Sequence, residues 1–290
     1  MNQNNEEYYL IFKSWSLDSN QWSILIGGIG VLLTLIGFLI AFKLYKRQRK
    51  DSSQDAFNFF QSSLPELKKS IEGTIENLKE FTKTLDSDNF SNPILSASLN
   101  DKFLNKINLV DLNRYYFKNR IEKIQTFNDF LIDSNFFGDY HSYFTNEINY
   151  FRNNYLEKEN IYAQWQLLRS NKFFSSMADN NENQEYKSFY ANWVQNLNKN
   201  QTIFEFNQQG QPTNVKNRKE LVESEIKTLA QDIFPFIQFS EKANDINLIA
   251  NRVVAAYADI SEMKEKVKST FEKDISKFEN VLNNLNKLIE

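Results

Sequence analysis

The residues best suited to binding chemistry lie in one short segment, where basic and aromatic side chains alternate. Guanidinium groups bind phosphate with paired hydrogen bonds and aromatic rings stack on planar groups, so the pattern suits a phosphorylated or nucleotide-like ligand, including short single strands. The alternative is that the rings belong to the core and the bases lie exposed beside them. The predicted anionic ligand patch consists of Arg114, Tyr115, Tyr116, Lys118, Arg120 and Lys123. Similar aromatic runs are flanked by Arg152, Arg169 and Lys172.

Signals for catalysis are weak. His141 is the only histidine and the chain has no cysteine, so the sequence indicates no Ser-His-Asp or Cys-His arrangement and no multi-histidine or thiolate metal site. Beyond the first 50 residues the glycines stand far apart, at Gly73, Gly138 and Gly210, which argues against a glycine-rich phosphate loop. Carboxylate-only hydrolysis stays open, although no acidic pair stands out. We therefore expect neither an enzyme nor a bound cofactor or metal.

A second patterned set of residues falls within an apolar stretch at residues 23–42. Small side chains recur there at steps of four and three residues, and we call this stripe the small-residue seam. The seam consists of Ser23, Gly27, Gly30, Thr34, Gly37 and Ala41. Small residues on one stripe of a membrane helix let helix backbones approach closely, and a 3.5-residue repeat suits a left-handed parallel bundle. The pattern favours self-association over a plain anchor with scattered glycines.

The same seam has another interpretation, as the lining of a pore. Small and hydroxyl-bearing residues around an axis could admit water, although no charge in the stretch supplies a selectivity ring. A basic cluster follows directly and would surround the inner mouth. Its alternative role is to hold the chain's orientation and to contact anionic lipid. This cluster consists of Lys43, Lys46, Arg47, Arg49 and Lys50.

Residues 23–42 themselves predict a transmembrane helix. The stretch has no charged residue, and its length matches the roughly 30 Å hydrocarbon thickness of a bilayer. Residues 1–22 carry a net charge of −2 and residues 43–50 carry +5. Because the more positive flank of a membrane helix usually lies on the cytoplasmic side, we expect the N-terminus outside and the remainder in the cytoplasm. We expect the protein in a cell inner membrane. The long acidic leader and the lack of a cleavage site argue against a cleaved signal peptide.

The remaining residues predict a helical cytoplasmic body. With the chain total at −3, residues 51–290 carry −6, which argues against bulk nucleic-acid binding. Apolar spacing predicts a helix over 57–85, with a kink or fresh start near Pro65, and one long helix, or two in line, over 246–289. A strand at 202–206 would form a small hairpin or an edge for another subunit. A loop is expected at 86–98, and further helices at 99–108, 111–134, 139–178, 184–199 and 216–237.

These features define an all-α protein with one N-terminal transmembrane helix. The predicted divisions are an outer segment 1–22, a transmembrane helix 23–42, a basic juxtamembrane helix 43–62, a helical domain 63–200, and a β/turn insert with long C-terminal helices 201–290. The layout resembles that of single-span effectors of bacterial anti-phage defence, in which a helical sensor domain controls a membrane helix, although no motif is shared. That resemblance implies a homo-oligomeric pore-forming or membrane-disrupting effector. The alternative is a tether that holds a cytoplasmic partner or regulatory protein at the membrane.

Overall fold

The computed structural model describes residues 19–87 and 99–290. Apart from one short hairpin and the connecting segments these residues are helical, so the all-α prediction is confirmed. They belong to two compact units: a first unit of Met1–Ser62 with Lys106–Ile124, and a second unit of Ser63–Asn105 with Gln125–Glu290. Most of the predicted outer segment 1–22 and of the predicted loop 86–98 lies outside the described residues.

Helix α2 (Ser19–Thr84) passes through both units without interruption. Pro65 lies inside it, so of the two alternatives predicted there, a kink or a fresh helix start, the fresh start is wrong. A proline removes one backbone donor, and the turns on either side can still hold the helix when they are packed. Leu64 and Leu67, which flank the proline, are both fully buried in the second unit. Packing of the apolar stripe therefore outweighs the capping signal at this position.

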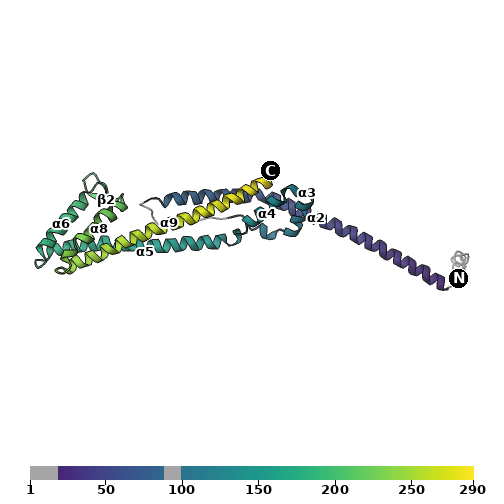
Figure 1. Cartoon of the computed structure of the whole chain (residues 1–290), viewed down its shortest axis with the longest axis horizontal. Coiled ribbons are helices and arrows are strands. Elements are labelled where there is room, and N and C mark those ends of the chain that lie inside the picture. The colour runs from purple at the N-terminus through teal and green to yellow at the C-terminus, as the bar shows by residue number, and fades with distance from the viewer. Residues whose placement is uncertain (1–18, 88–98) are drawn as a thin grey trace, which may run out of the picture. The chain divides into compact units, whose positions relative to one another are not determined.

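Three long segments form the core of the second unit. Helix α5 (Phe137–Ala178) and helix α9 (Glu241–Ile289) lie side by side, and residues 63–84 of α2 lie beside them (Figure 1). The contact is aromatic: the Phe81 ring lies 5.8 Å from that of Phe271 and 6.5 Å from that of Phe151. The predicted apolar stripe of the long C-terminal helix is confirmed, because Phe271 and Val267 are both buried.

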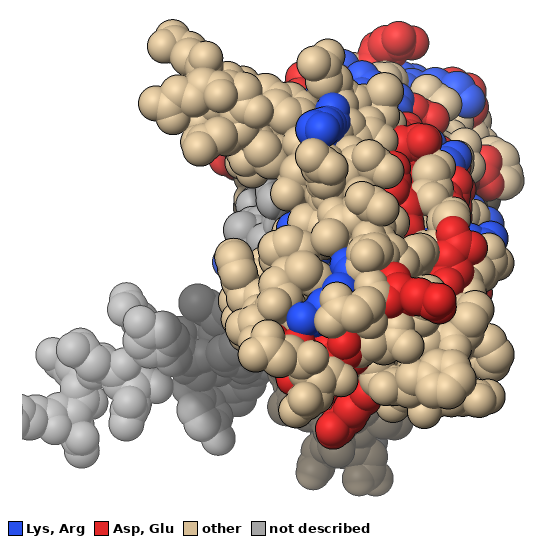
Figure 2. Space-filling model, turned by 90° about the vertical axis from the view of Figure 1, so that its left-hand side faces the viewer, with Lys and Arg blue, Asp and Glu red and all other residues tan. Residues whose placement is uncertain are grey.

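Shorter elements complete one end of the second unit. They are helix α6 (Gln184–Lys199), strands β1 (Phe204–Phe206) and β2 (Pro212–Val215), helix α7 (Arg218–Glu220), a π-helical segment (Leu221–Ile226), helix α8 (Lys227–Asp232) and a 3-10 turn (Phe234–Phe236). The two strands pair antiparallel, so of the two alternatives for residues 202–206 the hairpin is correct. Gly210 in its turn has φ of 72°, a conformation that favours glycine. Figure 2 shows acidic and basic side chains intermixed at this end of the unit.

The first unit contains residues 19–62 of α2, and the part of the helix around Phe57 packs against helix α3 (Leu109–Asn119). Asn108 caps α3 by accepting hydrogen bonds from the backbone N–H groups of Val110 and Asp111. Phe57 of α2 stacks on Tyr115 with ring centroids 4.0 Å apart and meets Tyr116 edge-on at 5.8 Å. These rings hold α3 against the helix that follows the apolar stretch.

Two predicted helices differ from the structure. The helix predicted over 111–134 is interrupted at Arg120, whose backbone has φ of −145° and ψ of 48°. A 3-10 turn (Ile121–Lys123) and helix α4 (Ile124–Asp133) follow it. Within 99–108 only a 3-10 turn (Leu104–Lys106) is helical. The extended backbone that Asn108 needs as an N-cap prevents that segment from continuing into α3.

Candidate membrane helix and basic groove

The apolar part of α2 is the single stretch among the described residues that is long and apolar enough to cross a membrane. Its most apolar window has a mean hydropathy of 2.7, and none of that window is buried within the chain. Ile24, Leu33 and Phe38 are each more than 60% exposed. A continuous apolar surface of this kind marks a membrane or protein interaction site rather than a water-facing helix.

The small-residue seam lies on this exposed helix and meets no other part of the described chain. A Cβ atom built on Gly27, Gly30 or Gly37 would have nothing within 4 Å, and the same holds for Gly28 off the seam. The hydroxyl of Thr34 donates to the carbonyl oxygen of Gly30 at 2.8 Å, so its hydrogen bond is made within its own helix. The seam is therefore open to a second helix, and its polar group needs no water.

Beyond the apolar stretch, α2 and α3 enclose a cavity of about 560 Å³, which we call the basic groove. Five basic side chains and no acidic one line it: Lys46, Arg49, Lys50, Arg114 and Lys118. Phe42, Tyr45, Ser53, Gln54, Tyr115 and Asn119 complete its walls. The groove thus combines two residue sets that the sequence presents separately, the basic cluster after the apolar stretch and the ligand patch around residue 114.

Aromatic rings position several of the basic groups. Lys46 Nζ lies 4.4 Å from the centre of the Phe42 ring, and the Arg49 guanidinium lies 4.6 Å from that of Tyr45. Such cation–π contacts orient a cation while leaving its hydrogen-bond donors free for an acceptor. Arg114 is less available, because it forms a 2.5 Å ion pair with Asp111. Lys50 and Lys118 are exposed, and no ion pair holds either among the described residues.

The remaining candidate residues lie outside the groove. Arg47 faces away from it and pairs with Asp51 at 4.0 Å, one helical turn along α2. The Arg120 guanidinium lies over the Phe57 ring at 5.9 Å. Tyr116 is a core residue at 1% exposure, and burial raises its pKa to about 12. Lys43 is exposed, and neither it nor Lys123 lines the groove.

Sequence reasoning missed the two aromatic walls on α2. Hydropathy assigns Phe42 to the membrane stretch and Tyr45 to the interface, and neither assignment shows that both rings face α3. Their spacing gives the available signal: positions 42, 46 and 50 and positions 45, 49 and 53 form two adjacent rows with steps of four residues, which places them on one helix face. His141 lies exposed on α5, and the described residues contain no group of three or more potential metal ligands.

Comparison of the chain with protein-family models, with curated proteins and with solved structures gives no match.

Proposed function

We propose that this is a single-pass membrane protein that self-associates through the small-residue seam and carries a cytoplasmic helical sensor domain. Its action would be that of a pore-forming or membrane-disrupting effector, of the kind used in bacterial anti-phage defence. The observation that carries the proposal is the fully exposed apolar stretch, which belongs to the same uninterrupted helix as a packed body. A bilayer is the environment in which that stretch would be buried.

The basic groove supports a cytoplasmic location for the body. The positive-inside bias rests on lysines and arginines that directly follow the membrane helix, and three of these, Lys46, Arg49 and Lys50, line the groove. A groove of this charge at the end of the stretch suits the phosphate of an anionic lipid, and this location favours a lipid over a soluble ligand. A location in the inner membrane is part of the same proposal.

The proposed lipid contact can be tested by replacing the two groove residues on α3. An Arg114→Ala, Lys118→Ala variant of the full chain should retain less phosphatidylglycerol after detergent purification, as counted by native mass spectrometry. Lys123→Ala removes a nearby positive charge outside the groove and should retain as much as the wild type. Equal retention by all three proteins would remove the groove from the proposal.

Self-association rests on the openness of the seam. In lipid there is little hydrophobic drive between helices, so close backbone contact and van der Waals packing must hold them together. The chain offers the seam no partner of its own among its described residues. A second copy of the same helix is therefore the natural occupant, and a change in its packing is the step that a sensor domain would control.

A tether or scaffold is the second candidate, and one observation favours it. The Thr34 hydroxyl is already bonded to the carbonyl oxygen of Gly30, and the stretch carries no charge, so the seam presents little that would stabilise water in a pore. A dry seam packs helices but conducts nothing. In that case the protein would hold a cytoplasmic partner at the membrane.

Replacing seam glycines separates the two candidates. Gly30→Leu with Gly37→Leu should leave insertion intact, because the stretch only becomes more hydrophobic, and should reduce the oligomer mass in detergent. Gly28→Leu adds the same bulk off the seam and serves as the matched control. An effector should lose ion leakage from liposomes in the seam variant alone. If that variant keeps the oligomer mass and the leakage activity of the wild type, the membrane helix serves only as an anchor.

A further inference from the structure

The second unit contains a larger cleft that the proposed membrane action does not use. Its volume is about 840 Å³, within the roughly 300–1,000 Å³ of small-molecule sites. Residues of α5 form its floor, the end of α6 contributes Asn198, and the β1–β2 hairpin with Arg218 forms the opposite wall. The cleft lies entirely within the second unit.

Arg169 on α5 places a charge in this cleft that the described chain leaves uncompensated. Its guanidinium lies 5.0 Å from the centre of the Trp165 ring. The Nη1 atom is buried and finds no hydrogen-bond acceptor among the described residues. Burial lowers the pKa of Arg169, and no carboxylate is among the groups that oppose this effect. No carboxylate pairs with this half-buried guanidinium among the described residues, and an anion bound in the cleft beside it would compensate its charge.

The second arginine of the cleft is already neutralised. Arg218 pairs with Glu159 through both terminal nitrogens, and the Nη2–Oε2 distance is 3.2 Å. Its guanidinium also lies 4.6 Å from the centre of the Tyr162 ring. The Arg218–Glu159 pair therefore orders Tyr162 at the cleft wall, while Arg169 keeps the uncompensated charge. The exposed amides of Gln166 and Asn198 offer further hydrogen-bonding groups to a ligand.

We propose that this cleft binds a nucleoside monophosphate, with the phosphate at Arg169 and the base against Phe204, a half-buried aromatic residue of the hairpin that lines the cleft. Arginine is suited to phosphate oxygens, and aromatic faces accept any planar base. The amides provide donors and acceptors for the sugar and the base edge. This inference gives a ligand class to the sensor role proposed above. Its interpretation as a sensor site rests on that proposed function, whereas the arrangement of the cleft residues does not.

Binding of AMP, GMP, CMP and UMP to the full chain in detergent tests the inference. At least one of the four should raise the unfolding temperature and show saturable binding by titration calorimetry. Its nucleoside, which lacks the phosphate, should bind at least about tenfold more weakly. Arg169→Gln should lose that binding by a similar factor. Arg152→Gln removes an exposed arginine of the same helix outside the cleft and should bind like the wild type.

A variant with the opposite expected effect guards against misfolding of Arg169→Gln. Glu159→Gln releases Arg218 from its carboxylate, so the same nucleotide should bind several-fold more tightly. Unchanged or weaker binding by that variant would overturn the inference. So would the absence of binding by all four nucleotides, or equal binding of nucleotide and nucleoside. The Gly30→Leu, Gly37→Leu variant should bind nucleotide normally, so failure of the membrane proposal stays distinguishable from failure of this one.

Discussion

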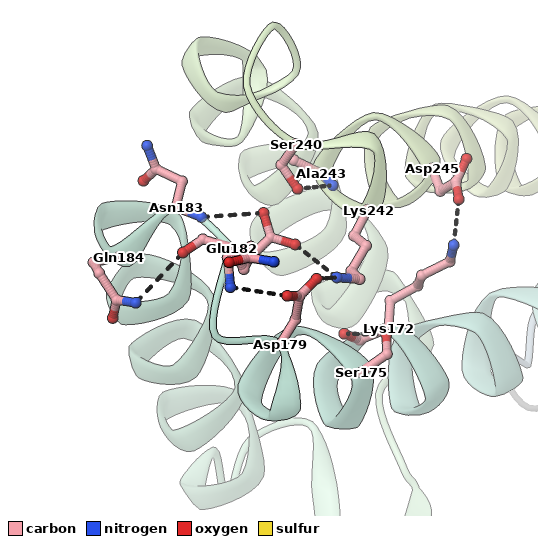
Figure 3. A network of polar contacts seen from close by, with 11 residues as sticks. Lys172, Ser175, Asp179, Glu182, Asn183, Gln184, Ser240, Lys242, Ala243 and Asp245 are labelled. Atoms are coloured by element: carbon pink, nitrogen blue, oxygen red, sulfur yellow. Dashed lines mark hydrogen bonds and ion pairs between the residues drawn. The ribbon is translucent and has the colours of Figure 1, made fainter.

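Lys242, in the first turn of α9, holds the loop between α5 and α6 by bridging two carboxylates (Figure 3). Its Nζ atom donates to Asp179 at 2.7 Å and to Glu182 at 2.9 Å. The hydrogen bond from Lys242 lowers the pKa of Asp179. For Glu182, burial acts to raise the pKa, and hydrogen bonds from Lys242 and Ser240 outweigh it, so the net shift is downward.

This bridge predicts a specific pH dependence of stability. Lowered carboxyl pKa values contribute stability above the ordinary values of 3.8 for Asp179 and 4.5 for Glu182, and that stability is lost as the pH falls through the lowered values. In Lys242→Met the burial of Glu182 is opposed less, so its pKa should rise. The variant should be less stable at neutral pH and lose less of its remaining stability on acidification.

Denaturant unfolding of the full chain at a series of pH values from about 7 to 3 measures this difference. Lys227→Met removes an exposed lysine of the same unit and should reproduce the wild-type pH profile. Superimposed profiles for Lys242→Met and the wild type would show that the bridge contributes nothing to the free energy of unfolding.

At the scale of elements, the stripe of α9 carries the core of the second unit. Phe271 is 1% exposed and touches aromatic rings of both α2 and α5. Phe271→Asp would place an unpaired carboxylate among those rings, and we expect it to destabilise the protein by at least about 3 kcal/mol. Lys273→Asp changes an exposed position two residues away and should cost little. Equal melting temperatures for the two variants would mean that the stripe is not packed as observed.

The sequence predicts the long helices well because each carries a sustained apolar period. The bounds of α5 and α6 fall within two residues of prediction, and α9 forms one helix rather than two in line. The break at Arg120 escapes such reasoning, because neither glycine nor proline marks it. The break follows the two tyrosines that pack against Phe57, and periodicity along one segment does not report such a tertiary contact.

The candidate sites show the same division between local and tertiary information. The sequence identifies the basic residues of the groove as two clusters, since residue type and spacing are local properties. That the two clusters line one cavity depends on the packing of α3 against α2. This packing brings Lys46 close to Arg114, although the two residues lie 68 positions apart in the chain. The cleft around Arg169 is even harder to predict from the sequence, because Arg218 and the hairpin come from a distant part of the chain.

At the scale of the whole molecule, the distribution of charge along the chain gives the membrane orientation that we propose. Residues 1–22 carry −2, residues 43–50 carry +5, and the rest of the chain carries −6. The net charge of a long domain has little effect on whether that domain is translocated across the membrane. The acidic body therefore does not oppose the positive-inside rule, and the lysines and arginines close to the membrane helix set the orientation. The N-terminus should therefore lie outside and the body inside.

Reporter fusions after Glu290 test this orientation directly. A reporter that is active only in the cytoplasm should work there, and one that is active only in the periplasm should not. Replacing Lys43, Lys46, Arg47, Arg49 and Lys50 with Gln removes the positive charge that follows the stretch and should give a mixture of orientations, because the hydrophobic length is unchanged. Replacing the same number of basic residues far from the stretch, within 264–277, should leave the reporter signal unchanged. A periplasmic signal from the unaltered chain would reverse the topology, and the second unit would then have no access to a cytoplasmic nucleotide.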